Sequence, residues 1–429
     1  MPVRPLDGIT VFENDSFVAG PSSTLALGQL GAEVIKIDPI KGGPDIDRWP
    51  ITPEGRSIYW NTLNRSKRSV AIDLRSEEGQ ELAQALITSP GEGSGVFVEN
   101  NVGRPFLSDQ VLRARREDLV HVKVQGSADG GPGVDYTVNA EVGIPLVTGP
   151  LGVDGPVNHV LPAWDLVCGQ AAVTAVVAGL LHRAGTGRGI YEEIALKDVA
   201  LSAVANLGWY SETLQPAGER TKHGNHIFGS FGTDYRTADD RHVMITAITN
   251  RQWGNLVQVT GMTEVVAALE TSLGTDFALE TNRYEYREVL QALFRPWFAS
   301  RAAAQVATDL EGSGVLWAPY ASMGEVAAEA LAEGGTGDQG ASTADRAGNG
   351  RLRRGSDQGA STAGVLRTLD TEALGTLLVG ANPIRVDGEY LADARPTVFG
   401  ADTARVLSER LGLASAEIGR LADAGVVKA

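Results

Sequence analysis

Two hydrophobic periodicities alternate along the first 126 residues. Short β-branched runs stand at 8–14 (GITVFEN), 32–38 (AEVIKID), 69–74 (SVAIDL), 95–100 (GVFVEN) and 119–127 (LVHVKVQGS). Segments with helical spacing separate them at 23–31, 77–87 and 107–116. This repeated β-α-β pattern predicts an α/β fold with a Rossmann-like, mostly parallel sheet and helices on both faces. After the first strand the chain reads ENDSFVAGPSS (13–23) instead of a glycine triplet, which disfavours a plain NAD-binding domain.

The pattern continues to about residue 205 and defines a predicted large domain, 1–205. Residues 129–156 are a loop rich in Gly and Pro, a composition typical of ligand-binding loops at the carboxyl ends of parallel strands. A long apolar helix follows; its run from Leu166 to Leu181 contains Gln170 and Thr174 and suits a buried helix better than a membrane span. A strand at 189–196 and a helix at 197–214 complete this part.

The remaining chain changes character. Residues 206–224 turn polar and predict a linker, and 225–325 predict a smaller α+β domain with an antiparallel hairpin turning at 238–241 and helices at 251–261 and 300–314. Residues 326–366 are an Ala- and Gly-rich low-complexity linker or loop, expected to be irregular. The C-terminal segment, 367–429, ends in helical spacing and is expected to return to the large domain.

Composition narrows the possible partners. The 429 residues carry a net charge of −16, which argues against broad binding of nucleic acids or membranes. The N-terminus becomes acidic before any apolar stretch develops, so we expect no signal peptide and a cytoplasmic protein. The single cysteine, Cys168, excludes an internal disulfide, offers no zinc spacing and is expected to be a buried small side chain.

Asp165 stands alone at the head of the long apolar helix. Its position after a proline fits a helix cap, because an Asp oxygen can accept hydrogen bonds from the first-turn N–H groups. The helix dipole would also favour the ionised carboxylate, and an ionised, positioned carboxylate is a nucleophile. Both interpretations are compatible with the local pattern.

Other candidate residues have weaker local signals. Arg65, Lys67, Arg68 and Arg75 surround one strand and suggest a site for an anion such as a nucleotide phosphate; the alternative is a solvated edge paired with Glu77 and Glu78. Histidines are scarce and form no metal-ligand pattern, and no serine nucleophile elbow is present. Asp135 and Asp165 could also form an acid/base pair.

Five ordered segments carry a family resemblance: LGQLGAEVIKIDP (27–39), LNRSKRSVAIDLRSEEG (63–79), VFVEN (96–100), LPAWDLVCGQ (161–170) and HRAGTGRG (182–189). Together the chain resembles the class III CoA-transferases, the formyl-CoA and carnitine CoA-transferase family. Further segments at 48–69, 134–139, 156–165, 223–237 and 317–320 are similar to a branch that moves CoA between the C1 and C4 carboxyls of 2-methylfumarate.

The resemblance implies a Rossmann-like large domain, a small domain, long linkers and an interlocked homodimer. It implies that Asp165 is the catalytic nucleophile, attacking the thioester to give an anhydride and then an aspartyl-CoA thioester. It implies no metal and no cofactor beyond the coenzyme A carried by the acyl-CoA substrate. The implied CoA contacts are Val18, Lys67, Ile72, Asp73, Arg75, Asn100 and Arg104, and the implied substrate contacts are Asp135, Tyr136 and Asn225.

Two departures from the family pattern stand out. HGNHIFGSFG (223–232) replaces the glycine-rich flap of formyl-CoA transferases, which fits a shielded intramolecular reaction or another substrate. A closing motif of many relatives reads here GADT, 400–403.

Three alternatives remain. The related racemases use a histidine where this chain has Val134, which removes their base. A non-catalytic CoA-binding paralogue is expected to lose the aspartate that is present here. An intermolecular transferase between two dicarboxylic acids is the main competing function.

Overall fold

The structure is a computed structural model that describes residues 3–216, 218–334, 364–391 and 395–428. The chain divides into two compact units, each described by itself below. The first unit contains Met1–Ile144, Asn158–Glu219 and Gly364–Ala429; the second contains Pro145–Val157 and Arg220–Ala363.

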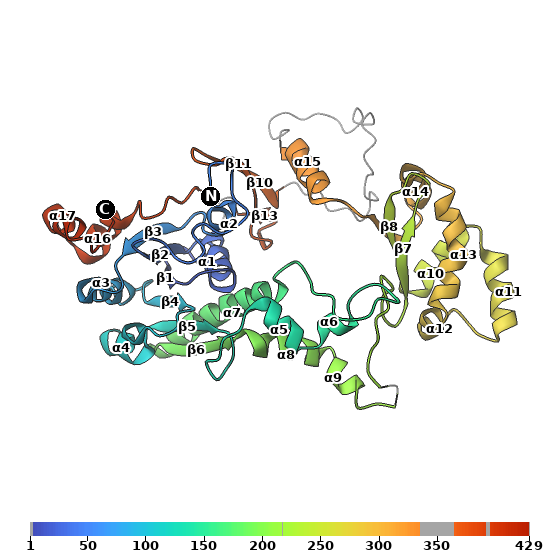
Figure 1. The fold of residues 1–429 in the computed structure, drawn as a ribbon, viewed down its shortest axis with the longest axis horizontal. Coiled ribbons are helices and arrows are strands. Elements are labelled where there is room, and N and C mark those ends of the chain that lie inside the picture. The colour runs from blue at the N-terminus through green and yellow to red at the C-terminus, as the bar shows by residue number, and fades with distance from the viewer. Residues whose placement is uncertain (1–2, 217, 335–363, 392–394, 429) are drawn as a thin grey trace. The chain divides into compact units, whose positions relative to one another are not determined.

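A six-stranded, all-parallel sheet forms the centre of the first unit (Figure 1). Its strands are β1 (Thr10–Asn14), β2 (Glu33–Pro39), β3 (Arg68–Ile72), β4 (Val96–Glu99), β5 (Val120–Gln125) and β6 (Ile190–Ala195). They are ordered β3-β2-β1-β4-β5-β6. The parallel α/β sheet expected from the sequence is confirmed. Because the chain runs outward from β1 in one direction and then from β4 in the other, a topological switch point lies between β1 and β4, where such sheets place ligands.

Side chains alternate between the two faces of the sheet, and each face packs into its own hydrophobic core. Phe12 and Phe97 point into a core closed by α3 (Glu77–Ile87), α4 (Asp109–Arg115), α16 (Thr403–Leu411) and α17 (Ser415–Asp423). Val11 and Val96 point into the other, closed by α1 (Ala19–Gln29), α5 (Asp135–Glu141), α7 (Ala163–Thr186) and α8 (Leu196–Asn206). The strands are buried on both faces, which explains their nearly continuous apolar runs. The expected return of the C-terminal helices to the large domain is confirmed.

Helix α7 is only partly covered, so the expectation of a buried helix was wrong in this respect. One stripe of small residues is buried: Cys168, Gly169, Ala172, Val176 and Gly179. Its other side leaves apolar side chains in solvent, among them Val167, Val177 and Leu181. Within the described residues α7 alone has the length and composition of a membrane span, with a mean hydropathy of 1.6. A helix packed on a sheet can have the same length and composition. The predicted burial of Cys168 itself is confirmed.

The edge of the sheet at β3 is covered by the C-terminal part of the chain. Asp402 Oδ2 accepts a hydrogen bond from the N–H of Ser69 at 3.0 Å, and Thr403 Oγ1 accepts one from the N–H of Ala71 at 3.1 Å. Val427 forms a β-bridge with Ile72. The GADT segment therefore covers the edge of β3. Without this cover, the free N–H groups of the strand could pair with another chain.

Several smaller elements complete the first unit. They are α2 (Ile58–Leu63), the 3₁₀ turn η1 (Pro105–Leu107), α9 (Trp209–Glu212) and two hairpins, β10 (Leu366–Thr371) with β11 (Gly375–Gly380) and β12 (Arg385–Val386) with β13 (Glu389–Tyr390). The predicted helix 197–214 is divided at Gly208, whose φ of 77° ends the helical path. Helix α6 (Ile144–Val147) lies where the chain passes from the first unit to the second.

The second unit is an α+β arrangement around a three-stranded antiparallel sheet. Strands β7 (Phe231–Arg236), β8 (His242–Ala247) and β9 (Leu316–Pro319) pair in that order. The hairpin expected at 238–241 is confirmed, since Arg236 pairs with His242. Its helices are α10 (Asn250–Val259), α11 (Thr263–Leu273), α12 (Glu280–Glu285), α13 (Arg287–Ala299), α14 (Ala303–Leu310) and α15 (Met323–Gly334).

The division of the chain differs from the predicted boundaries in three places. Pro145–Val157 belongs to the second unit although it falls within the predicted large domain, and residues 206–219 belong to the first unit and include α9. Residues 326–334 are helical rather than irregular because Ala and Glu favour the last turns of α15. The rest of the predicted low-complexity tract, 335–363, lies outside the described residues.

Candidate active site

Asp165 lies in the first turn of α7, at the carboxyl-terminal side of the parallel sheet. Its side chain is half-buried, and within the described residues its carboxylate makes no hydrogen bond or ion pair. A partly accessible carboxylate without a partner can attack a substrate carbon, since no hydrogen bond has to break first.

The cap of α7 comes from a different aspartate. Asp135 Oδ2 accepts hydrogen bonds from the backbone N–H groups of Trp164 at 2.7 Å and of Asp165 at 3.1 Å. Asp135 is buried, and its other oxygen lies 2.7 Å from Nε2 of His159. The expectation that Asp165 caps its own helix was therefore wrong, because the capping N–H groups already have an acceptor. Asp135 fixes the backbone at the start of α7 through two hydrogen bonds and is itself held by His159.

The surroundings of Asp165 favour its neutral form. Burial, followed by the negative charge of Asp135, raises the pKa of Asp165 to about 6, against the opposing charge of Arg48. The predicted effect of the helix dipole is thus outweighed, because burial disfavours the charged form and Asp135 at the helix N-terminus adds a like charge. A carboxylate with a raised pKa is a stronger base, and it is still mostly ionised at pH 7.

Arg48 packs against two aromatic rings, and its charge acts on Asp165. The Arg48 guanidinium lies 5.4 Å from the ring centre of Phe17 and 5.6 Å from that of Tyr59. Burial raises the pKa of the Tyr59 hydroxyl against the opposing charge of Arg48, and the Asp165 carboxylate adds to the increase. The hydroxyl of Tyr136 donates to the carbonyl of Val160 at 3.1 Å. This bond fixes the ring of Tyr136, which directly follows Asp135 in the chain, and its predicted contact with substrate stays a prediction.

Close packing of α7 on α1 brings Asp165 near the loop that follows β1. A Cβ atom at Gly169, one turn beyond Asp165, would lie 2.4 Å from Oγ of Ser22 and 3.0 Å from the carbonyl oxygen of Ala19. Only glycine allows this approach. Val18 immediately precedes α1, so this helix contact joins the predicted nucleophile to one predicted CoA contact.

The switch point of the sheet carries three of the predicted CoA contacts. Asn100, after β4, accepts from the N–H of Ser16 at 3.1 Å and donates to the carbonyl of Ser16 at 2.8 Å. Arg104 donates to Oδ1 of Asn14, at the end of β1. With Val18 in the same loop, these side chains lie together where a parallel sheet of this order binds ligands.

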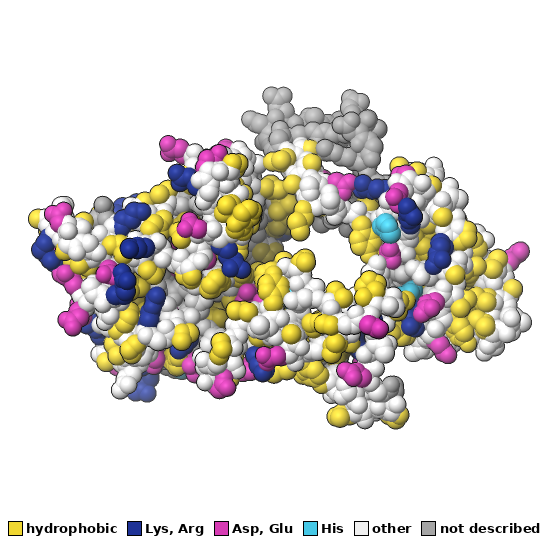
Figure 2. Space-filling view, in the orientation of Figure 1, with side chains coloured by type: hydrophobic (Ala, Val, Ile, Leu, Met, Phe, Trp, Pro, Cys, Tyr) yellow, Lys and Arg dark blue, Asp and Glu magenta, His cyan; other side chains and the backbone are white. Residues whose placement is uncertain are grey.

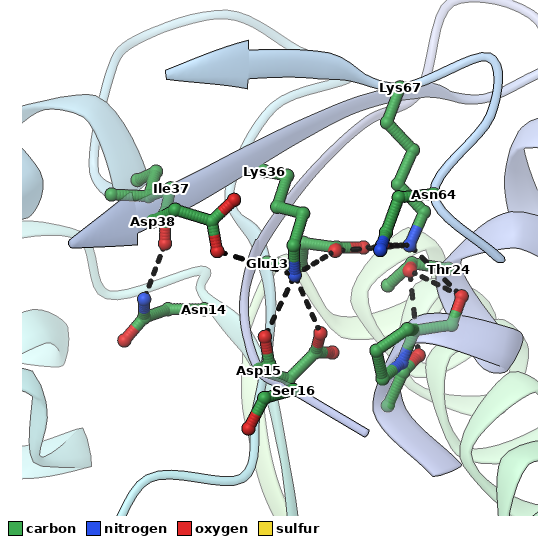
Figure 3. A network of polar contacts seen from close by, with 12 residues as sticks. Glu13, Asn14, Asp15, Ser16, Thr24, Lys36, Ile37, Asp38, Asn64 and Lys67 are labelled. Carbon is green, nitrogen blue, oxygen red and sulfur yellow. Dashed lines mark hydrogen bonds and ion pairs between the residues drawn. The ribbon is translucent and has the colours of Figure 1, made fainter. Parts of the chain in front are cut away.

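Behind this loop lies a network of buried charges (Figure 3). Lys36 Nζ contacts Oε1 of Glu13 at 2.9 Å, the carbonyl of Asp15 at 2.7 Å and Oδ1 of Asp38 at 3.6 Å. Burial raises the pKa of Asp38 to about 6, although the Lys36 ammonium opposes this effect. The network ties the ends of β1 and β2 to the loop that presents Val18.

Lys67 belongs to this network rather than to the surface. Its Nζ donates to Glu13 at 3.0 Å, to the carbonyl of Pro21 at 3.0 Å and to Oδ1 of Asn64 at 3.0 Å, and the residue is buried. Three donors are the full capacity of an ammonium group. A direct contact between Lys67 and CoA would require these bonds to break, so this geometry does not support that prediction.

The predicted basic cluster is divided by the fold. Arg65 is buried and donates to the carbonyls of Thr62 and Gly380, and Arg68 pairs with Glu33 and Glu409. The four basic residues therefore do not form one anion site, and they do not form one solvated edge paired with Glu77 and Glu78. Both interpretations of the cluster were wrong. Figure 2 shows the same mixing at large scale, with acidic and basic side chains interspersed over the end of the first unit that carries α3, α4 and α17.

At the end of β3, the three predicted contacts differ in accessibility. Ile72 is fully buried, and its carbonyl accepts from the N–H of Leu74 at 3.0 Å, so its predicted CoA contact is not supported by this geometry. Asp73 Oδ1 accepts from Nε of Arg75 at 3.3 Å, and the Arg75 side chain is 82% exposed. Arg75 is thus the accessible cation of the predicted basic segment.

Asn225 belongs to the second unit. Its Nδ2 donates to Oδ1 of Asp234 at 3.0 Å, and Oδ2 of Asp234 lies 2.9 Å from Nδ1 of His242. Asn225 is exposed, and its predicted contact with substrate stays a prediction.

Sequence reasoning gave no role to Arg48, Tyr59 or His159. The first two lie between β2 and the end of α2, in a segment used only for the family resemblance. The sequence did contain a signal for Arg48. It stands in a loop that follows a predicted strand, and loops at the carboxyl edge of a parallel sheet are where ligands bind. His159 carries no such local signal, because its partner Asp135 is distant in the sequence.

Comparisons with known proteins agree with this geometry. Residues 6–340 match CoA-transferase family III. A 2-methylfumaryl-CoA isomerase of Chloroflexus aurantiacus is 38% identical over 98% of this chain and 97% of its own length. A human succinyl-CoA:glutarate CoA-transferase is 25% identical over 99% of this chain and 90% of its own length.

Among solved structures, a CAIB/BAIF family protein from Brucella suis superposes with a TM-score of 0.72, covering 94% of this chain and 99% of its own, at 24% identity. That likeness concerns the fold. The family match spans most of the chain and includes the segment that presents Asp165. This protein therefore belongs to CoA-transferase family III and is an enzyme of that family.

Proposed function

We propose that this enzyme moves CoA between the C1 and C4 carboxyls of 2-methylfumarate within one substrate molecule, with Asp165 as nucleophile. The observation that carries the proposal is the half-buried Asp165 carboxylate, which has no hydrogen-bond or ion-pair partner among the described residues. The backbone N–H of Asp165 donates to Asp135, which fixes the residue in place. The 38% identity with a 2-methylfumaryl-CoA isomerase over nearly the whole chain supports the choice of substrate.

The chemistry follows from the polarity of the bonds. The Asp165 carboxylate attacks the thioester carbon at C1, which forms a mixed anhydride and expels CoA as its thiolate. The thiolate attacks the Asp165 carbon of the anhydride, giving an aspartyl-CoA thioester and free 2-methylfumarate. The C4 carboxylate then attacks that thioester, a second anhydride forms, and the returning thiolate attacks C4. Asp165 is regenerated, and no CoA is consumed.

Each step is a substitution at an acyl carbon and needs no redox change. We therefore propose coenzyme A, brought in by the substrate thioester, as the only cofactor. We propose that Val18, Asn100 and Arg104 line its binding site at the switch point, with Asp73 and Arg75 near the end of β3. Their positions at the carboxyl edge of one sheet support this assignment.

A homodimer is part of the proposal. Helix α7 exposes 44% of Val177 and 75% of Leu181. A second copy of the chain would remove such side chains from water, and apolar area buried in this way is the main driving force of association.

An isotope-labelling experiment tests the proposal. The enzyme is incubated with 2-methylfumaryl-CoA thioesterified at C1 and an excess of labelled free 2-methylfumarate, and both CoA regioisomers are followed by mass spectrometry. Unlabelled C4 thioester is the expected product, since the acid stays bound throughout. Labelled product would establish intermolecular transfer instead, and no conversion would refute this substrate.

A further inference from the structure

Arg48 is a fixed cation that the proposed chemistry has not used. It lies in the segment between β2 and α2, and its backbone is held on both sides. Its N–H donates to the carbonyl of Asp45 at 3.1 Å, and its carbonyl accepts from Oγ of Ser57. Ser57 also caps α2 by accepting from the N–H of Trp60 at 3.0 Å. This anchoring limits where the Arg48 side chain can go.

The guanidinium is positioned by two aromatic rings. It lies over Phe17 at 5.4 Å and over Tyr59 at 5.6 Å from the ring centres. Phe17 has a φ of 68°, a left-handed conformation that costs free energy for a residue with a side chain, and its N–H is held at 2.9 Å by the buried Asp45. The fold thus maintains an unfavourable backbone conformation at the residue that supports Arg48.

No carboxylate of the described residues neutralises this cation. Across the part of the chain that the structure describes, Arg48 makes no ion pair, and the residue is exposed. The ring beneath Arg48 belongs to Phe17, two residues before Ala19, and Ala19 packs against Gly169, one turn beyond Asp165. The positive charge of Arg48 accordingly acts to lower the pKa of Asp165. An arginine with a preset plane, free N–H donors and a nucleophile nearby is suited to grip a planar carboxylate with two parallel hydrogen bonds.

We infer that Arg48 binds the free carboxylate of the substrate, the one not engaged in the thioester, and thereby makes the enzyme selective for dicarboxylyl-CoA. This inference rests on the proposed function and specifies how the site recognises its substrate. A diacid bound as its monothioester presents one carbonyl to Asp165 and keeps one negative charge. Arg48 is the unpaired cation beside Asp165 in the described chain that can receive it.

Two other roles for Arg48 predict different behaviour. If Arg48 bound a phosphate of CoA, it would contribute equally to all acyl-CoAs. If it only modulated the charge of Asp165, it would not affect affinity once Asp165 is removed. Both alternatives can be separated from carboxylate binding by measuring affinity without turnover.

The test uses the full-length Asp165→Ala protein, which binds ligand without chemistry. Dissociation constants are measured by calorimetry for succinyl-CoA, butyryl-CoA, 2-methylfumaryl-CoA and free CoA, before and after adding Arg48→Gln. Succinyl-CoA and butyryl-CoA differ by a carboxylate in place of a methyl group. The control is Arg56→Gln, since Arg56 is exposed in the same segment. Arg48→Lys keeps the charge without the planar fork.

With Arg48 present, a dicarboxylyl-CoA should bind at least about tenfold more tightly than butyryl-CoA, the scale of one charge-assisted contact. Arg48→Gln should remove this preference and leave butyryl-CoA and CoA within about twofold. Arg48→Lys should retain part of it, and Arg56→Gln all of it. A preference that survives Arg48→Gln, an equal loss for every CoA ligand, or no preference at the outset would each overturn the inference. If succinyl-CoA bound more tightly than butyryl-CoA but 2-methylfumaryl-CoA did not, only the proposed substrate would be refuted.

Discussion

Asp135 and Asp165 are neighbours in space, yet their surroundings give them different tasks. Asp135 is buried and bound by two backbone N–H groups and by His159, so its oxygens are occupied. Asp165 has no such partners among the described residues and is half-buried. The acid/base pair considered from the sequence is thus replaced by a positioning aspartate and an available one.

Replacing Asp165 by Ala should remove turnover and leave binding of CoA largely intact. The nucleophile is lost, while the cap of α7 comes from Asp135 and is preserved. We expect a fall in kcat of about three orders of magnitude or more. Steady-state kinetics and calorimetry with CoA check this, and circular dichroism controls for folding. Substantial residual turnover would exclude Asp165 as nucleophile.

Activity should fall as the medium becomes acidic. The pKa of Asp165 is raised to about 6, mainly by burial and then by Asp135. Its ionised form, which the attack requires, is therefore dominant above pH 6 and is lost below it. We expect kcat/KM to fall about tenfold per pH unit below that value, because the profile of kcat/KM reports groups on the free enzyme. A flat profile between pH 5 and 7 would contradict this assignment.

At the scale of elements, the contact between α1 and α7 connects the helix that carries Asp165, the proposed nucleophile, to the switch point. The two helices approach closely at Gly169, opposite Ala19 and Ser22. The buried stripe of α7 consists of small side chains and one branched one, Val176, and small side chains allow such an approach.

Substituting Gly169 by Val should destabilise the fold and reduce activity. A Cβ there would lie 2.4 Å from Oγ of Ser22, so the helices must separate. We expect a loss of about 1–3 kcal/mol in the free energy of unfolding, typical of overpacking. Urea denaturation and kinetics measure both effects. Gly185→Val is the matched control on the same helix, because its Cβ would meet nothing within 4 Å. Equal effects at both positions would show that the contact is unimportant.

At the scale of the molecule, the strand order places chemistry at one edge of one sheet. The order β3-β2-β1-β4-β5-β6 puts the switch point between β1 and β4, and the loops there hold Val18, Asn100 and Arg104. The apolar outer side of α7 extends from the first turn, which carries Asp165, to Leu181.

This exposed side predicts an oligomer. We expect the protein to elute with about twice its chain mass of 45.2 kDa in light-scattering chromatography. Leu181→Glu should weaken association by about tenfold or more, since Leu181 is 75% exposed in the single chain and a charge would oppose its burial. The substitution should not alter the circular dichroism spectrum. A wild-type protein that is monomeric at micromolar concentration would refute the homodimer.

Local information in the sequence was sufficient for the parallel sheet, the hairpin at 238–241, the burial of Cys168 and the family. Hydrophobic periodicity is a property of neighbouring residues, and the resemblance depends on contiguous segments, so both can be read without a fold. Strands β9 to β13 and helices α11 to α13 were missed. Strand β9 is short and pairs with β8, far away in the sequence, whereas β10–β11 and β12–β13 are local hairpins.

Tertiary structure decided which charged groups are available. Asp135 caps a helix that begins 28 residues later, Lys67 joins Glu13 across the sheet, and Arg65 reaches Gly380, so their apparent freedom in the sequence disappears. Arg48 and Asp165 are separated by over one hundred residues, yet their charges interact. The sequence alone determined the fold class and the candidate nucleophile. Pairing, burial and unpaired charge depend on contacts between segments far apart in the chain, and only the folded chain brings those segments together.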